Sequence, residues 1–228
     1  MADNARRFCA AAAPRPAETG TRAALLKEFQ WEAGERIGVR FLEGDASLHE
    51  RVRAVAEEWV GPRMANLDLQ FLDDGPATVR VAFAPGDGSW SYLGTTAQQI
   101  PTDRATMNYG WLTPDSPEDE LRRVVLHEFG HALGLIHEHQ NPEEPVRWNR
   151  AAVIADLSGA PNFWDEATIE HNIFAAYDPE QVIATPVDAD SIMMYPIPAS
   201  WTTDGFSADL NPELSETDTG FIRDAYPW

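Results

Sequence analysis

The sequence predicts an α+β fold with two lobes around a cleft, and three observations support it. Short segments of alternating hydrophobicity fill the first half of the chain, and two amphipathic helical patterns accompany them. Beyond residue 140 the chain is rich in Pro and Asp and has no clear period. Since 228 residues suffice for one sizeable domain, we expect a single domain over residues 31–228, with an upper lobe to about residue 136 and a lower lobe from 137.

The predicted sheet has about five strands. Residues 35–42, 67–72 and 78–84 alternate apolar and polar side chains, as half-buried strands do. Residues 90–93 and 105–109 are shorter candidates for a fourth and a fifth strand.

Two long helices and one short helix are predicted. Apolar residues recur at helical spacing over residues 48–59, and Gly61-Pro62 ends that pattern. The second helix is expected to begin at Ser116, which can form a capping box with Asp119. A final short helix is predicted over residues 215–225.

Residues 1–30 are predicted to form a flexible tail or a short pro-segment, because they are rich in Ala, Pro and Arg without periodicity. The N-terminal residues do not resemble a signal peptide, and no apolar run is long enough to span a bilayer. Cys9 is the single cysteine, so no intramolecular disulfide is possible. The location stays open between the cytoplasm and export by a non-classical route.

The chain is strongly acidic, with 17 basic against 37 acidic residues and a net charge of −20. Such a surface repels phosphate backbones and anionic lipids. We therefore expect neither nucleic acid nor a membrane as a partner.

A candidate metal site lies in the stretch LHEFGHALGLIHEH, residues 126–139. His127 and His131 are four residues apart on the second predicted helix, so both imidazoles lie on one face. Two neutral imidazoles in this arrangement can bind zinc at roughly 2.0–2.1 Å. Glu128 lies at the rim of the same face, where it can reach a metal-bound water without ligating the metal.

His137 is the candidate third ligand, provided that the helix ends before it. On a continued helix His137 would lie roughly 240° around the cylinder from His131 and would face away from the metal. Gly134 can adopt a positive φ, end the helix and return the chain beneath the metal. Three His ligands leave one coordination position open, as a catalytic zinc requires. The stretch predicts one Zn²⁺ per chain, with Glu128 as general base for the bound water.

The pattern His-Glu-x-x-His-x-x-Gly-x-x-His fixes five positions, and a chance match in one such chain is on the order of one in 10⁴ to 10⁵. The alternative is a helix with three core histidines. This motif resembles the signature of the metzincin metallopeptidases, and other segments resemble their astacin branch. SIMMYP, residues 191–196, is similar to the astacin methionine turn. The resemblance implies that Met193 supports the site, and that Tyr195 is a fifth metal ligand in the free enzyme and stabilises the tetrahedral intermediate.

GSWSYLG, residues 88–94, resembles the upper edge strand of astacins, which lies antiparallel to bound substrate. The resemblance implies that Ser89, Trp90, Ser91 and Tyr92 bind an extended peptide by β-augmentation. It covers about residues 31–228. It implies a twisted, mainly parallel or mixed sheet with two long helices in the upper lobe, and an irregular lower lobe with a C-terminal helix. The implied activity is zinc-dependent endopeptidase cleavage of proteins or peptides by a monomer.

Several positions depart from the astacin pattern. Ser89 replaces the usual Cys, and Met194 replaces the usual His of the methionine turn. Cys9 could cap the zinc as a thiolate, as in matrixins, but its neighbours differ from theirs and favour an inert or exposed thiol. His139 is expected to be exposed, and no calcium motif is present.

Three alternatives to a general endopeptidase remain: a narrow-specificity processing peptidase, a catalytically degenerate module that binds zinc or peptide, and a hydrolase of another amide. Glu128 argues against degeneration, and the edge-strand resemblance favours a peptide substrate.

Overall fold

The computed structural model describes residues 8–12, 29–141, 145–175 and 187–228. Among the described residues, no helix is both long enough and apolar enough to cross a membrane.

A six-stranded mixed sheet forms one side of the molecule. Its order is β1-β5-β6-β4-β2-β3, and every neighbouring pair is parallel except β5 and β6. The strands are β1 (Cys9–Ala12), β2 (Arg36–Phe41), β3 (Asp68–Phe71), β4 (Val79–Ala82), β5 (Ser89–Tyr92) and β6 (Met107–Tyr109). The five predicted strands and the mixed, mainly parallel character are confirmed.

The sixth strand, β1, was not predicted. It comes from the N-terminal stretch for which the sequence predicts a flexible tail or a pro-segment, and it pairs with β5 from Cys9 opposite Ser89 to Ala12 opposite Tyr92. The prediction of a flexible tail is therefore wrong for Cys9–Ala12. Residues 1–7 and 13–28 lie outside the described residues.

The predicted long helices are α1 (Ala46–Ala56), which continues into the 3₁₀ turn η1 (Glu57–Trp59), and α2 (Glu118–Ala132). Ser215 caps the predicted final helix, α5 (Glu216–Ala225), through a capping box. The predicted cap of α2 is wrong: the Ser116 hydroxyl accepts a hydrogen bond from the Thr113 N–H at 2.9 Å, and α2 begins two residues later.

The lower lobe contains helices that the sequence did not predict. They are α3 (Arg150–Leu157), α4 (Glu166–Ile169) and the π-turn η4 (Glu170–Phe174), and short 3₁₀ turns lie at η2 (Gly94–Gln99), η3 (Glu138–Gln140) and η6 (Ala199–Trp201). These helices are short and lie between Pro and Asp residues that obscure their period.

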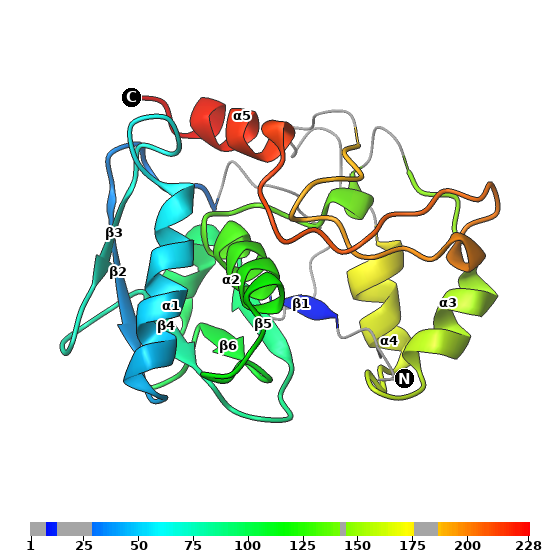
Figure 1. The fold of residues 1–228 in the computed structure, drawn as a ribbon, viewed down its shortest axis with the longest axis horizontal. Coiled ribbons are helices and arrows are strands. Elements are labelled where there is room, and N and C mark those ends of the chain that lie inside the picture. The colour runs from blue at the N-terminus through cyan, green and yellow to red at the C-terminus, as the bar shows by residue number, and fades with distance from the viewer. Residues whose placement is uncertain (1–7, 13–28, 142–144, 176–186) are drawn as a thin grey trace.

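Two hydrophobic cores underlie the two lobes. The first core joins the sheet to α1, α2 and α5, and the second joins α3 and α4 to the segment 194–208. In Figure 1 the sheet lies on the left together with α1 and α2, α3 and α4 lie on the right, and β1 lies between the two groups. The C-terminal helix, expected in the lower lobe, packs through Ile222 on the first core instead.

Candidate metal centre

Helix α2 carries the first two candidate ligands and the candidate base into the centre of the molecule. His127, Glu128 and His131 are all buried. The apolar side chains of Leu121 and Val125 are fully buried in the first core, so the helix has a fixed position against the sheet. Burial of this apolar face, rather than helix propensity, is what holds the ligands in place.

Gly134 ends α2 in the way that the sequence predicts. Its φ is +97°, a left-handed conformation that glycine adopts without strain. The N–H of Gly134 bonds the His131 carbonyl at 2.8 Å, and the N–H of Leu135 bonds the Gly130 carbonyl at 2.8 Å, which together form a Schellman motif. The same turn presents the Leu135 carbonyl to Nδ1 of His131 at 2.8 Å. Nδ1 must therefore carry the proton, which leaves Nε2 free as a metal ligand.

The last carbonyls of α2 are bonded by side chains from both ends of the domain. Trp31 Nε1 donates to the Ala132 carbonyl at 2.9 Å, and the Tyr226 hydroxyl donates to the Leu133 carbonyl at 2.6 Å. Buried carbonyls at a helix end require such partners. The turn that carries the third ligand is thus fixed from two directions.

His127, His131 and His137 come together as the sequence predicts. One ring nitrogen of each lies within 4.8 Å of those of the other two. Nε2 of His131 and Nε2 of His137 are 3.1 Å apart. Two ligands at 2.0–2.1 Å in tetrahedral geometry would be about 3.3–3.4 Å apart, so the spacing of this pair is close to the one that zinc requires. Nε2 of His127 has no hydrogen-bond partner among the described residues. The donor set therefore fits a zinc ion.

Burial sets the protonation of the site. It holds the pKa of His127 and of His137 well below the usual value and lowers that of His131 to about 4. These imidazoles are therefore neutral at pH 7, the form that binds a metal. Burial also raises the pKa of Glu128 to about 8, although the Cys9 thiol beside it and the positive charge of Arg123 act in the opposite direction. A cation beside this carboxylate would favour its ionised form.

The methionine turn lies directly beneath α2. A Cβ on Gly130 would be 2.4 Å from Sδ of Met193, so only glycine allows this approach. The Met193 carbonyl accepts from the Glu138 N–H at 3.1 Å. Met193 therefore contacts the metal-binding helix and, through its backbone, the segment after His137, although it was predicted from resemblance alone.

Asp218 connects α5 to this turn. Its carboxylate accepts from the Ser191 hydroxyl at 2.7 Å and from the Ile192 N–H at 2.8 Å. The Ile192 carbonyl accepts in turn from Nδ1 of His127 at 2.9 Å. A buried carboxylate thereby fixes the backbone group that orients a zinc ligand. Asp218 was not predicted from the sequence, because a capping-box residue gives no sign that it also bonds a distant turn.

We expect Asp218→Asn to lower the free energy of unfolding by about 1–3 kcal/mol, since the two turn donors bond different carboxylate oxygens and the amide keeps only one acceptor oxygen. Zinc affinity should fall as well, because His127 loses a fixed partner. Urea denaturation and competition with a zinc indicator measure the two effects. Asp224→Asn, an exposed residue on the same helix, is the matched control and should change stability by less than about 0.5 kcal/mol. Equal midpoints for both variants would contradict the role of Asp218.

Tyr195 lies beside the ligands. Its ring centroid is 4.2 Å from that of His137, and its hydroxyl donates to the Cys9 carbonyl. His139, expected to be exposed, is 3% exposed and stacks on Tyr195 at 4.8 Å. That expectation is wrong, because Nε2 of His139 bonds the Asn172 carbonyl at 2.8 Å and the ring becomes part of the wall behind Tyr195.

Cys9 is also buried, so of the two expected alternatives, an inert or an exposed thiol, the exposed one is wrong. It is 2% exposed, and burial together with the neighbouring Glu128 raises the pKa of the thiol well above its usual value. Because β1 pairs with β5, the predicted edge strand is not an edge here. Ser89 and Ser91 of that strand are buried, and Trp90 and Tyr92 are half-buried. The strand pairs here with an extended segment in parallel, whereas the pairing predicted for a substrate is antiparallel.

Comparison with known proteins supports the same assignment. No family model matches the chain. The chain is 25% identical to zinc metalloproteinase nas-30 of Caenorhabditis elegans over 173 residues, 73% of this chain and 19% of that protein, so the match spans about a fifth of that relative.

Solved structures match over most of the chain. One structure of myroilysin has a TM-score of 0.85 at 40% identity and covers 89% of this chain and 98% of that chain. A crystal structure of myroilysin has a TM-score of 0.72 at 37% identity, and the match covers 99% of this chain and 93% of that chain. HCE-1, a hatching-enzyme zinc protease of Oryzias latipes, has the same fold, with a TM-score of 0.53 at 18% identity. The match covers 87% of this chain and 94% of that chain. With its zinc-binding histidines and methionine turn in place, the chain belongs to the astacin-like zinc metallopeptidases of the metzincin group, a family of zinc-dependent endopeptidases.

Proposed function

We propose that this chain hydrolyses internal peptide bonds of proteins at the three-histidine centre, with Glu128 as general base and Tyr195 as a hydrogen-bond donor to the reacting carbonyl. One observation carries the proposal. The Glu128 carboxylate is completely buried beside three converging imidazoles, and the Cys9 thiol is the side chain that lies against it. A buried carboxylate with so little compensation is destabilising, so its place here is best explained by a catalytic role.

His127, His131 and His137 would hold the zinc, which when bound supplies a Lewis acid that polarises the scissile carbonyl and acidifies water. Glu128 takes a proton from the attacking water as the new C–O bond forms, and then passes it to the amine nitrogen as the C–N bond breaks. The Tyr195 hydroxyl donates a hydrogen bond to the carbonyl oxygen on which charge develops. In this structure the same hydroxyl donates to a backbone carbonyl, that of Cys9.

Substrate would pair with β5 once β1 is displaced. The backbone of β5 bonds the segment Cys9–Ala12 in this structure, and an extended peptide offers the same donors and acceptors. The residues of β5 proposed for this contact are Ser89, Trp90, Ser91 and Tyr92.

The N-terminal segment, within residues 1–30, would be a pro-segment that keeps the enzyme latent. The Cys9 side chain lies against Glu128, and the Cys9 carbonyl accepts the hydrogen bond of the Tyr195 hydroxyl. A peptide substrate cannot reach either group while the segment is in place.

Protein or peptide is the substrate class, and we propose that the enzyme acts as a monomer without nucleic acid or membrane as a partner. The net charge of −20 supports the proposal that neither nucleic acid nor a membrane is a partner. Light scattering after gel filtration tests the monomeric state, and the mass of a dimer would contradict it.

Cleavage of unfolded casein, together with metal analysis, tests the proposed function. After release of the N-terminal segment we expect casein products and about one zinc per chain. A chelator should stop cleavage, and added zinc should restore it. Zinc without any cleavage of casein would favour the narrow-specificity processing peptidase, and absence of zinc would contradict the proposal.

A further inference from the structure

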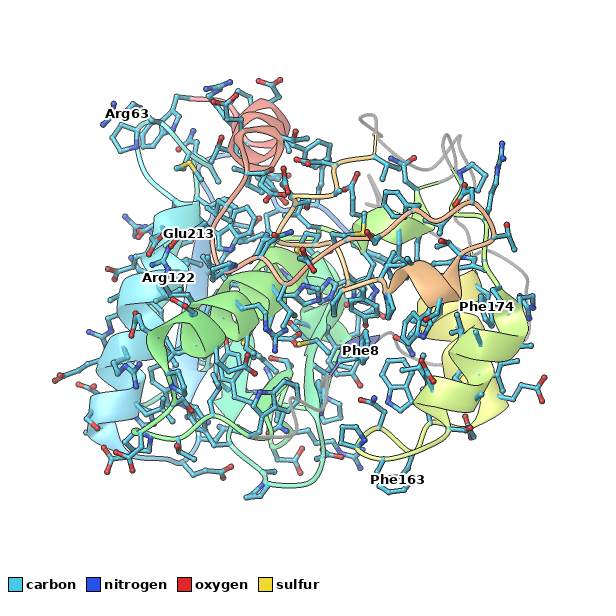
Figure 2. All side chains as sticks on the ribbon, turned by 45° about the vertical axis from the view of Figure 1, so that its right-hand side comes forward. Phe8, Arg63, Arg122, Phe163, Phe174 and Glu213 are labelled. Carbon is cyan, nitrogen blue, oxygen red and sulfur yellow. The ribbon has the colours of Figure 1, made fainter. Side chains whose placement is uncertain are left out.

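Three aromatic rings surround Phe8 in the cleft, and we call the space that they enclose the Phe8 pocket. The Phe8 ring centroid lies 5.3 Å from that of Tyr195, 5.5 Å from that of Trp201 and 6.1 Å from that of Trp164. Phe8 stacks on Trp201 and meets the other two rings edge-on, and it is only 6% exposed. Figure 2 shows Phe8 between α2 and the helices of the lower lobe.

Two walls of the Phe8 pocket, Trp201 and Tyr195, also have partners outside the N-terminal segment. Trp201 Nε1 donates to Asp156 at 2.7 Å, which fixes that ring against α3. Tyr195 stacks on His139 and contacts His137. Because both rings have partners of their own, the pocket should keep its shape when Phe8 leaves it, and it would then present an apolar surface.

The pocket adjoins the reacting groups. Cys9, the next residue after Phe8, lies against Glu128, and its carbonyl bonds the Tyr195 hydroxyl. Tyr195 is thus both a wall of the pocket and the proposed donor to the reacting carbonyl. A side chain in the pocket therefore belongs to a residue close in sequence to the bond that is cut.

The direction of the chain decides on which side of that bond the residue lies. Strand β1 runs parallel to β5, so Phe8 precedes the segment that pairs with Ser89–Tyr92. Antiparallel pairing is somewhat more stable per residue than parallel pairing, and an antiparallel substrate would run the opposite way. Its N-terminal part would lie along β5, and its C-terminal part would enter the Phe8 pocket.

We infer that the Phe8 pocket is a specificity pocket that binds an aromatic side chain of the substrate, one or two residues C-terminal to the cleaved bond. This inference rests on the proposed function. The ring distances around Phe8 match those of favourable aromatic pairs, 4.5–7 Å between centroids. A charged side chain would lose its hydration there, and an aliphatic one would be buried without stacking.

The cleavage sites in a proteome-derived peptide mixture, determined by mass spectrometry, test the inference. The full-length chain is used after the N-terminal segment has been cut. We expect Phe, Tyr and Trp to be enriched several-fold at the first or second position after the cut. Trp164→Ala should reduce this enrichment about 3- to 10-fold, since it removes one aromatic pair, and Trp164→Phe should restore most of it.

Phe163→Ala is the matched control, because its side chain is 72% exposed and points away from the pocket (Figure 2). It should keep the wild-type profile. Cleavage without aromatic enrichment on the C-terminal side, or with enrichment on the N-terminal side, would overturn the inference while leaving the proposed function intact. Absence of any cleavage would contradict the proposed function itself.

A second measurement uses the uncut chain and does not depend on a folded pocket variant. If the pocket selects aromatic rings, Phe8→Tyr should keep the residual activity near that of wild type. Phe8→Leu should raise the residual activity and Phe8→Ala should raise it further, by about 3- to 10-fold in all. The reason is that the N-terminal segment would fill the cleft for a smaller fraction of the time. Equal residual activity in all of these variants would overturn the inference.

Discussion

Glu128→Gln is expected to lower kcat/KM on a peptide substrate by about 10²- to 10⁴-fold, the usual contribution of a general base, while zinc content stays at about one per chain. The amide keeps the shape of the side chain but cannot accept a proton. Because Glu128 is not among the three converging ligands, its replacement should leave metal binding intact. Initial rates on a fluorogenic peptide and metal analysis of the same samples measure both quantities.

Asp119→Asn is the matched control for this loss. It lies on the same helix, is exposed and removes the same charge, so its kcat/KM should stay close to that of wild type. If Glu128→Gln retained zinc and full activity, another residue would have to serve as the base. If it lost zinc together with activity, the loss could not be assigned to proton transfer.

The chemistry of the centre was predictable because it depends on local spacing. The i, i+4 pair His127 and His131 and the left-handed Gly134 follow from helix geometry alone. The strands and α1 were predictable because half-buried strands and amphipathic helices repeat their side chains with fixed periods. The helices α3 and α4 were missed because four to eight residues are too few to establish a period.

Contacts between distant segments could not be predicted in this way. Asp218 bonds Ile192 across 26 residues, and Tyr195 bonds Cys9 across 186. Strand β1 pairs with a strand about eighty residues later, and its residues Cys9–Ala12 lack the alternation that marks a half-buried strand. The burial of His139 likewise depends on η4, an element that the sequence did not indicate.

Release of the N-terminal segment is expected to raise activity by about 10- to 100-fold, since a segment that closes the cleft reduces the competent fraction by the same factor. Strand β1 pairs with the backbone of β5. The Cys9 side chain lies against Glu128, and its carbonyl accepts the hydrogen bond of the Tyr195 hydroxyl. A recognition site for a sequence-specific protease, placed within residues 13–28, allows one folded sample to be assayed before and after cutting. Mass spectrometry after gel filtration confirms that the segment has left.

The wild-type chain treated with the same protease is the control, and its activity should not change. Activation only after the cut segment has left would assign residues 1–30 to a pro-segment, because the catalytic domain is otherwise identical in both states. Equal activity before and after release would instead mean that substrate displaces β1 unaided. In that case the four residue pairs between β1 and β5 would be weak enough to exchange for a substrate strand, and the N-terminal residues would act as a tail rather than as an inhibitor.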